Sequence, residues 1–582
     1  MMFTRILLAC ATLATLPATV QAVEVYPLDK VNRGLKGQGV TVIAGDALTR
    51  FGVTVLGVLP DFIGPGQDLI LARLDGTEVE YTGVISGMSG SPVYVDGKLL
   101  GAVSYRLGMF SKEPIAGITP AALMLAAATP AAAPRARRTQ VTDDVDLQQL
   151  RPIDTPLVVA GAPPGLIEFY APRLREHGLI AVRGGAGARS AAPAKPFVPG
   201  GAMAGVLVDG DINLAATGTV TLVEGTRIIG FGHPFLGRGA SAIPLATAEI
   251  VATLPSLAGS SKIGVVTGLV GTLVDDRSTA VVGEVGALPP MVSLQLDLDG
   301  DPHLLGHDQS RVFRFKVFQD PTLTPLFVEL AMASALGGRV GFNAGGSAEL
   351  RVSIQVPGRT ELRIEERVSV SDGGSVAAVA ARLVGSAVGT LWSNRFEPLP
   401  GLRVTVRARL AREPRQATLV SARISPPALR AGESAEIEVQ LQDYHGQRRT
   451  LRQRVSVPEG EAPGTLRLLV GGDEAVRKLD QDAGRDRVPT TLDDILHSLA
   501  QRRQGDRLYL VLAREDAGLR VDGTALPGLP PSMLGVLSRG SEGVLRAATT
   551  QRIINEQSLD PGLVIQGQIS LELELLPQRV SP

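Results

Sequence analysis

The sequence predicts a mainly β protein built from several domains. The chain has 582 residues, enough for three to four domains. It contains 67 glycines and 40 prolines but only 4% aromatic residues, and its valine-rich runs alternate apolar with polar positions. Short strands joined by many turns produce this pattern, whereas helical bundles do not.

The most informative element is the loop Gly87-Met88-Ser89-Gly90-Ser91-Pro92. A hairpin follows it, because Val93-Tyr94-Val95 and Lys98-Leu99-Leu100 flank the turn pair Asp96-Gly97. Glycines on both sides of Ser89 permit positive φ angles and clear the space in front of the hydroxyl. The loop is typical of a serine-protease nucleophile, with the backbone N–H groups of Gly87 and Ser89 as oxyanion donors.

This loop has two other interpretations. The nucleophile elbow Gly-x-Ser-x-Gly requires a glycine two residues after the serine and a helix behind it. Ser91 occupies that position, and Pro92 and a hairpin follow, which favours a loop between strands as in two-barrel proteases of the chymotrypsin type. A glycine- and serine-rich turn without chemistry is the remaining alternative.

Residues 82–103, from Thr82-Gly83 through the hairpin, resemble the SpoIVB serine peptidase family. Upstream, residues 40–45 and 51–59 look like the strands that precede the nucleophile in that family. The resemblance implies a catalytic aspartate seven residues before the threonine, which is Asp75 here. This assignment requires a one-residue gap relative to the family pattern, because the family has one more residue between the threonine and the serine.

The resemblance also implies a general base at His233, in a Gly-His dipeptide that follows a strand pair opening with Gly218-Thr219. Independently, all six histidines lie after Ser89, so a histidine that activates Ser89 must come from downstream. Asp275 and Asp276, in another segment similar to the family, are the fallback candidates for orienting His233.

The other histidines fit less well. His177, His445 and His497 lie in polar or amphipathic surroundings typical of solvated or packing residues. His303 and His307 are four apart, but Pro302 and an intervening glycine make a helical metal-binding pair doubtful. No metal and no cofactor is predicted.

The order of the lobes departs from the family, in which the histidine lobe precedes the serine lobe. A triad depends on geometry and not on chain order, so we expect a permuted, two-lobed chymotrypsin-like β-barrel protease. Two functions stay open. One is an exported serine endopeptidase, which could also process itself, using Ser89, His233 and Asp75. The other is a non-catalytic cell-envelope or adhesive protein that retains a protease-like scaffold.

Composition shifts predict the domain boundaries. A lobe with Asp75 and Ser89 spans residues 23–126 and closes with a short alanine-rich helix. Residues 127–201 contain Ala/Pro- and Gly-rich connectors around a small segment, and residues 202–346 form the lobe with His233. Residues 347–582 alternate apolar and polar positions, which predicts one or two β-sandwich-like domains interrupted by a helix at 376–392.

Residues 1–22 predict a secretory signal, because Arg5 precedes an apolar run that ends in small residues at Val20-Gln21-Ala22. Cys10, the only cysteine, offers a lipid-anchor alternative, but too short an apolar region precedes it. Cleavage after Ala22 would leave a chain without disulfides. No later stretch has eighteen uninterrupted apolar residues, so we expect no transmembrane segment in the mature chain.

These features predict a bacterial protein exported to the periplasm, the cell envelope or the medium. Its 57 basic and 58 acidic residues give no basic bias, so nucleic acid is not an expected partner. The expected partners are a protein or peptide substrate and an envelope component bound by the C-terminal β region.

Overall fold

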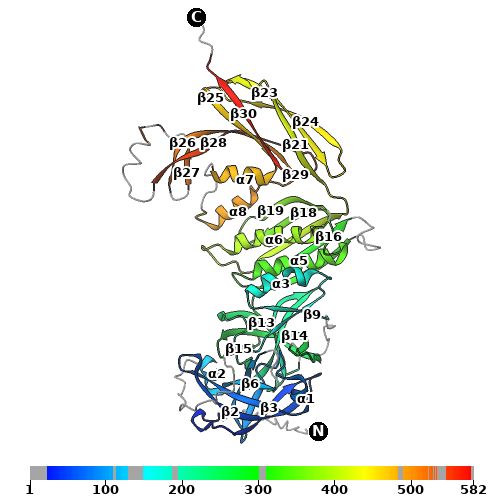
Figure 1. Cartoon of the computed structure of the whole chain (residues 1–582), viewed down its shortest axis with the longest axis vertical. Helices are drawn as coiled ribbons and strands as arrows, with labels where there is room; N and C mark the ends of the chain where they lie inside the picture. The colour runs from blue at the N-terminus through cyan, green and yellow to red at the C-terminus, as the bar shows by residue number, and fades with distance from the viewer. Residues whose placement is uncertain are drawn as a thin grey trace, which may run out of the picture. The chain divides into compact units, whose positions relative to one another are not determined.

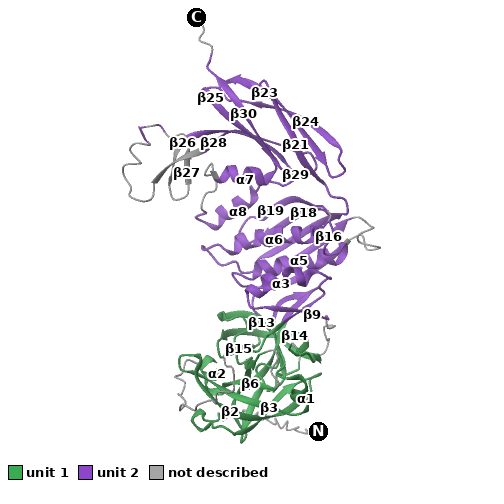
Figure 2. Cartoon of the chain, in the orientation of Figure 1, with its two compact units in different colours: residues 1–156, 187–205, 216–288 green, residues 157–186, 206–215, 289–582 purple. Residues whose placement is uncertain are grey.

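The computed structural model describes residues 23–108, 113–128, 149–185, 195–257, 259–300, 310–371, 373–482, 489–521, 524–527, 530, 532–533 and 545–578. The chain divides into two compact units (Figure 2): unit 1 comprises residues 1–156, 187–205 and 216–288, and unit 2 comprises residues 157–186, 206–215 and 289–582. The predicted signal with Cys10, the stretch 135–138, and His303 and His307 lie outside the described residues.

Unit 1 begins with a closed antiparallel barrel of six strands (Figure 1). Its strands are hydrogen-bonded in the order β4-β1-β2-β3-β6-β5, and β5 pairs back with β4. Alternate side chains such as Val53, Ile70 and Val103 fill its interior. The strands are β1 (Lys36–Val42), β2 (Leu48–Gly64), β3 (Gln67–Asp75), β4 (Pro92–Val95), β5 (Lys98–Leu107) and β6 (Ile115–Pro120).

Short elements complete this barrel. The predicted hairpin is confirmed, since β4 and β5 pair around Asp96 and Gly97, whose φ angles are 48° and 76°. Two consecutive positive φ angles are what a type I′ hairpin turn requires. The remaining elements are η1 (Leu28–Lys30), α1 (Thr77–Thr82), the alanine-rich helix α2 (Ala121–Ala128) and β7 (Leu150–Pro152), which pairs with β5.

A second ring of six strands carries His233. Its strands follow the order β10-β13-β14-β15-β12-β11, and β10 also pairs with β11, which closes the ring. They are β10 (Ala202–Gly210), β11 (Asn213–Glu224), β12 (Arg227–Gly230), β13 (Gly239–Leu254), β14 (Ser261–Arg277) and β15 (Ala280–Val285). The mainly β architecture, with the serine barrel first in the chain, confirms the predicted fold class.

In unit 2, helices pack on a mixed sheet of strands ordered β19-β18-β20-β16-β17. Helix α6 has the bounds that the sequence predicted, and the Ser375 side chain caps it by accepting a hydrogen bond from the Ala378 N–H. This layer contains β16 (Met291–Gly300), β17 (Ser310–Phe318), α5 (Thr324–Val340), β18 (Gly346–Gln355), β19 (Leu362–Val370), α6 (Val376–Trp392) and β20 (Arg403–Ala411). Residues 289–346, expected in the lobe with His233, thus belong to unit 2.

Unit 2 also contains an early segment of the chain: β8 (Pro156–Ala160), α3 (Leu166–Glu176) and β9 (Ile180–Gly184). Tyr170 on α3 is buried and donates a hydrogen bond from its hydroxyl to Glu329 of α5 at 3.0 Å. No helix among the described residues is long and apolar enough to span a bilayer.

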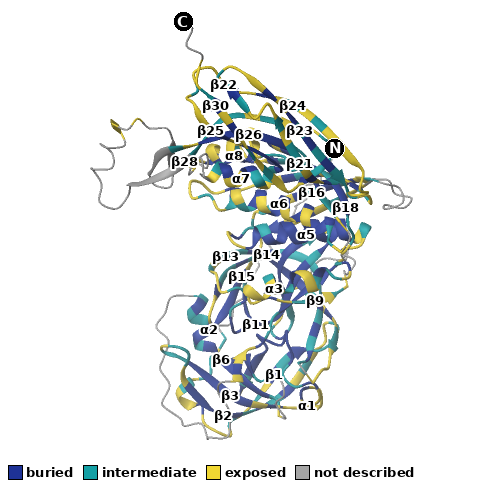
Figure 3. Ribbon diagram, turned by 45° about the horizontal axis from the view of Figure 1, so that its top comes forward, coloured by how far each residue is buried: buried dark blue, intermediate teal, exposed yellow. Residues whose placement is uncertain are grey.

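The last part of unit 2 is a β-sandwich, as the alternating pattern predicted. A four-stranded sheet (β24-β23-β21-β29) and a six-stranded sheet around β30-β25-β26 bury one apolar core between them. Figure 3 shows buried residues along these strands. The elements are β21 (Gln416–Ser425), β22 (Ala428–Arg430), β23 (Ser434–Asp443), β24 (Arg448–Ser456), β25 (Gly464–Gly471), α7 (Asp473–Asp482), α8 (Leu492–Ala500), β26 (Leu508–Val521), β27 (Thr524–Pro527), β28 (Leu545–Leu559), β29 (Val564–Gln566) and β30 (Gln568–Leu576).

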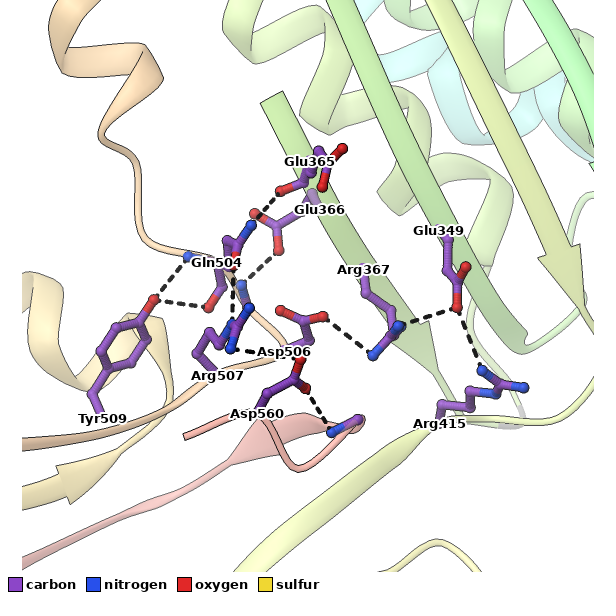
Figure 4. A network of polar contacts seen from close by, with 12 residues as sticks. Glu349, Glu365, Glu366, Arg367, Arg415, Gln504, Asp506, Arg507, Tyr509 and Asp560 are labelled. Carbon is purple, nitrogen blue, oxygen red and sulfur yellow. Dashed lines mark hydrogen bonds and ion pairs between the residues drawn. The ribbon is translucent and has the colours of Figure 1, made fainter. Parts of the chain in front are cut away.

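A polar network joins the helical layer to the sandwich within unit 2 (Figure 4). The Gly505 N–H donates to the Glu366 carboxylate at 2.6 Å, and Arg367 forms ion pairs with Asp506 at 3.2 Å and Glu349 at 3.1 Å. The residues before β26 are thereby fixed to strand β19.

Candidate active site

The Ser89 loop is a tight turn between α1 and β4. The Ser91 N–H donates to the Met88 carbonyl at 3.0 Å, which places Ser89 and Gly90 at the centre of a four-residue turn. Gly90 has a φ of 93°, as the third position of a type II turn requires. A Cβ at Gly90 would lie 2.0 Å from the Thr219 carbonyl oxygen, so only glycine fits.

Two backbone N–H groups of this turn stand out. Among the described residues, the N–H groups of Gly87 and Ser89 donate to no acceptor. Their neighbours are all bonded: Ser86 N–H to Ser260 O at 2.8 Å, Met88 N–H to Ile85 O at 3.0 Å, and Gly90 N–H to Val103 O at 2.8 Å. The two free donors are those that the sequence predicts for an oxyanion.

The Ser89 side chain is buried, and its Oγ atom has no hydrogen-bond partner among the described residues. Its neighbour Ser91, by contrast, donates from its hydroxyl to the Met88 carbonyl at 2.6 Å. Native structures pair most buried hydroxyls, and leaving one unpaired costs about 1–3 kcal/mol. An unpaired buried serine between two bonded turn residues is therefore a candidate reactive group.

His233 lies on the turn that follows β12. Its ring Nδ1 is 2.8 Å from the Pro234 carbonyl oxygen. Because a carbonyl oxygen can only accept, Nδ1 carries the proton, and the unprotonated Nε2 is left with its lone pair. Nε2 is buried without a partner among the described residues.

Burial lowers the pKa of His233 to about 4, although the hydrogen bond to Pro234 and the charge of Asp154 both act to raise it. The imidazole is therefore neutral at pH 7. A neutral ring with a free Nε2 lone pair is the form that a general base needs.

One strand residue, Thr219 of β11, brings the two turns together. Its N–H donates to the Ser89 carbonyl at 2.8 Å, and its own carbonyl accepts the Phe231 N–H at 3.3 Å, two residues before His233. The histidine turn is also tied to the first barrel, since the Thr119 hydroxyl donates to the Gly232 carbonyl at 2.7 Å. The expected hydrogen bond between Ser89 Oγ and His233 Nε2 is not formed, and both atoms are left unpaired.

Asp75 makes no hydrogen bond to the histidine ring, whose Nδ1 is bonded to the Pro234 carbonyl. It is an exposed residue at the end of β3, and its carboxylate lies over Gly52, where a Cβ would be 1.9 Å from Oδ1. The ring nitrogen that this carboxylate was expected to face is bonded to Pro234 instead. The geometry therefore differs from the expectation that Asp75 lies beside His233.

The fallback aspartates do not touch the ring either. Asp275 forms an ion pair with Arg277 at 2.7 Å. Asp276 is buried and accepts N–H groups from Phe235, Leu236 and Gly237 at 2.7, 2.6 and 2.8 Å. Burial raises the pKa of Asp276, and these N–H groups act to lower it. Asp276 thus shapes the turn just after His233.

The carboxylate whose charge reaches His233 is Asp154, which the sequence analysis missed. Asp154 follows β7 and forms an ion pair with the buried Arg106 of β5. The Ile153 N–H donates to the Ser104 carbonyl at 2.9 Å, and a Cβ at Gly232 would lie 2.9 Å from the Ser104 Cβ. No local motif marks Asp154; only the pairing of β7 with β5 brings it to the histidine turn.

The comparisons with known proteins bear on this site. Residues 11–119 match the family model described as SpoIVB peptidase S55. Neither the curated proteins nor the solved structures give a match. The matched segment contains Asp75 and Ser89, whereas His233 and Asp154 lie beyond it. Over residues 11–119 the chain is therefore confirmed as similar to the SpoIVB peptidases.

Proposed function

We propose that this protein is an exported serine endopeptidase in which Ser89 is the nucleophile and His233 the general base. The observation that carries the proposal is the pair of buried, unpaired atoms, Ser89 Oγ and His233 Nε2, on two turns that both hydrogen-bond to Thr219. The family match supports peptidase activity. Export rests on the signal-like sequence of residues 1–22.

In the first step, Ser89 Oγ attacks the peptide carbonyl carbon while its proton passes to His233 Nε2. The carbonyl oxygen becomes an oxyanion, which the free N–H groups of Gly87 and Ser89 can bind. The intermediate collapses, the C–N bond breaks, and His233 returns the proton to the leaving amine. Water then attacks the acyl-serine by the same route and releases the carboxylic acid and free Ser89.

We assign the supporting carboxylate to Asp154. A negative charge near the ring stabilises the imidazolium that forms when His233 takes the Ser89 proton. Asp154 supplies such a charge, whereas Asp75 is exposed and the Pro234 carbonyl already orients Nδ1. Asp75 is the alternative that the family resemblance implies.

Ser89 Oγ is buried in this structure, so attack on a peptide requires a movement that exposes it. This closed arrangement is the one observation that favours the alternative function, a non-catalytic envelope protein with a protease-like scaffold. Activity measurements separate the two functions directly.

The test is hydrolysis of an unfolded protein substrate by the full-length chain. We expect Ser89→Ala to lose several orders of magnitude in kcat while its thermal unfolding matches the wild type. Ser278→Ala, which changes an exposed serine of the same unit, is the matched control and should keep full activity. Equal hydrolysis by wild type and Ser89→Ala, or none by either, would exclude the peptidase mechanism.

A further inference from the structure

Lys262, which the mechanism above does not use, lies against the Ser89 turn. It is the second residue of β14, and its N–H donates to the Ser86 carbonyl at 3.0 Å. Its side chain is 2% exposed. A lysine buried to this degree is rare without a carboxylate partner, and the only hydrogen-bond partner of Nζ among the described residues is a hydroxyl.

The charged end of Lys262 reaches the turn through two hydroxyls. Nζ donates to Thr41 Oγ1 at 2.8 Å, and Thr41 Oγ1 is hydrogen-bonded to Ser91 Oγ at 3.0 Å. Ser91 Oγ in turn donates to the Met88 carbonyl at 2.6 Å. Met88 and Ser91 are the two ends of the turn that contains Ser89, so this chain of hydrogen bonds ends at the turn that carries the nucleophile.

The aliphatic stem of Lys262 supports the other side of the turn. A Cβ built at Gly87 would lie 3.4–3.6 Å from the Cβ, Cγ and Cδ atoms of Lys262, which places the Gly87 backbone directly on the stem. Gly87 supplies one of the two free N–H groups. Lys262 therefore contacts the Gly87 side of the turn with its stem, and its amine is linked to the Ser91 side through the Thr41 hydroxyl.

We propose that Lys262 is a positioning residue that holds the Ser86–Ser91 turn in its reactive form and that its proton controls how fast Ser89 reacts. This inference rests on the proposed function. The protonated amine donates to Thr41 and places a positive charge on the residue whose stem packs against Gly87. Loss of the proton weakens both effects, so we expect Ser89 to react more slowly.

The surroundings of Lys262 set the pH at which its amine loses the proton. Thr41 on β1 and Ser91 in the turn are neutral, and Ser86 meets Lys262 only through its backbone. No charged group in the described part of the chain contributes to the pKa of Lys262, which burial lowers to about 7. The pKa of His233 is about 4, so the two titrations are well separated.

The experiment measures the rate at which a fluorophosphonate labels Ser89 in the full-length protein between pH 3 and 9. In the wild type we expect the rate to rise through about pH 4 and to fall several-fold through about pH 7. Lys262→Met keeps the stem without the amine; we expect a maximum at least tenfold lower and no fall near pH 7. Lys195→Met, which changes an exposed lysine of the same unit, should behave like the wild type.

A second variant keeps the test decisive if Lys262→Met does not fold. Thr41→Val removes the hydroxyl that accepts from Nζ, which destabilises the protonated amine. We expect a slower maximum and an alkaline fall moved below pH 7. A pH profile unchanged in both variants, or in Thr41→Val when only that variant folds, would overturn the role of Lys262. Absence of any Ser89 labelling in the wild type would instead overturn the proposed function.

Discussion

At the scale of single residues, the site combines two unpaired atoms with charges that the fold brings to them. Ser89 Oγ and His233 Nε2 are buried without a hydrogen-bond partner in the part of the chain that the structure describes, and the Pro234 carbonyl fixes the tautomer in which Nε2 carries the lone pair. The carboxylate that acts on the ring is Asp154, which lies 65 residues after Ser89 in the sequence. In the proposed mechanism, each of these groups has a separate effect on the reaction.

The choice between Asp154 and Asp75 predicts different kinetics for their amide variants. Asp154→Asn removes the charge that raises the pKa of His233, so the acid limb of kcat/KM should move below about pH 4. The maximal rate should fall roughly 100-fold or more, because the imidazolium loses its counter-charge. Asp75→Asn should change neither the limb nor the rate.

Because Asp154 also pairs with the buried Arg106, the thermal unfolding of both variants is measured beside the pH profiles. A destabilised Asp154→Asn protein with an unmoved acid limb would show that Asp154 is only structural. If Asp75→Asn loses activity and Asp154→Asn keeps it, the carboxylate that supports His233 is Asp75 and not Asp154.

At the scale of the elements, the loops depend on close contacts between strands that are distant in the sequence. Local patterns were enough to predict the Asp96-Gly97 hairpin and the helix at 376–392, because turn chemistry and helical periodicity are local properties. Local patterns were not enough to predict that Asp154 and Lys262 lie near the site. β7 pairs with β5, and β14 meets the Ser86 backbone, through non-local hydrogen bonds that leave no sequence motif.

The turn after His233 gives a prediction for Asp276. Its carboxylate accepts three N–H groups in a buried position. Asp276→Asn replaces one oxygen with an NH₂ group that faces other donors, which should lower the free energy of unfolding by about 1–3 kcal/mol and reduce activity. Urea unfolding followed by circular dichroism measures the change.

Asp275→Asn is the matched control, since Asp275 accepts none of the N–H groups of this turn. One of its oxygens is buried without a partner among the described residues, and the other pairs with the half-exposed Arg277, a kind of pair that contributes at most about 1 kcal/mol. Equal losses of stability in the two variants would contradict the turn-shaping role of Asp276.

At the scale of the whole molecule, unit 1 contains the serine barrel, most of the second ring of strands and every site residue discussed. Unit 2 contains residues 206–215 from β10 and β11, the helical layer and the sandwich. The sequence predicted β-barrels followed by a sandwich, because alternation and turn residues report strands. It did not separate residues 289–346 from the lobe with His233, because strands β16 and β17 alternate in the same way in either setting.

The network in unit 2 predicts a pH-dependent stability. Burial raises the pKa of Glu366 from 4.5 to about 7. Between these two pH values the folded state therefore holds a proton that the unfolded state has lost. Stability from this group is therefore present below pH 4.5 and lost as the pH rises through 7. The Gly505 N–H and Arg502 favour the charged form, and Asp473 and Asp506 oppose it.

The amide oxygen of Glu366→Gln can still accept from the Gly505 N–H. This variant should stabilise unit 2 by on the order of 3 kcal/mol at pH 8, and its free energy of unfolding should depend less on pH between pH 5 and 7. Thermal unfolding of the full chain between pH 5 and 8 measures both effects, with the exposed Glu365→Gln as control. A curve as steep in Glu366→Gln as in the wild type would contradict the assignment.

Self-processing is expected in the connectors that the sequence places at 127–138 and 184–201. Purified wild-type protein should accumulate fragments with ends in these stretches, and Ser89→Ala protein should stay intact under the same conditions. Mass spectrometry of the fragments gives their ends. Identical fragments from both proteins would assign the cuts to other proteases.

The most direct test of the central claim is to locate a covalent adduct after treating the folded, full-length protein with a fluorophosphonate. The mechanism predicts one adduct per chain, mapped by tandem mass spectrometry to Ser89, and its loss in both Ser89→Ala and His233→Gln. An adduct on another serine, or labelling of Ser89 that is as fast in His233→Gln as in the wild type, would contradict the proposed pairing of Ser89 with His233.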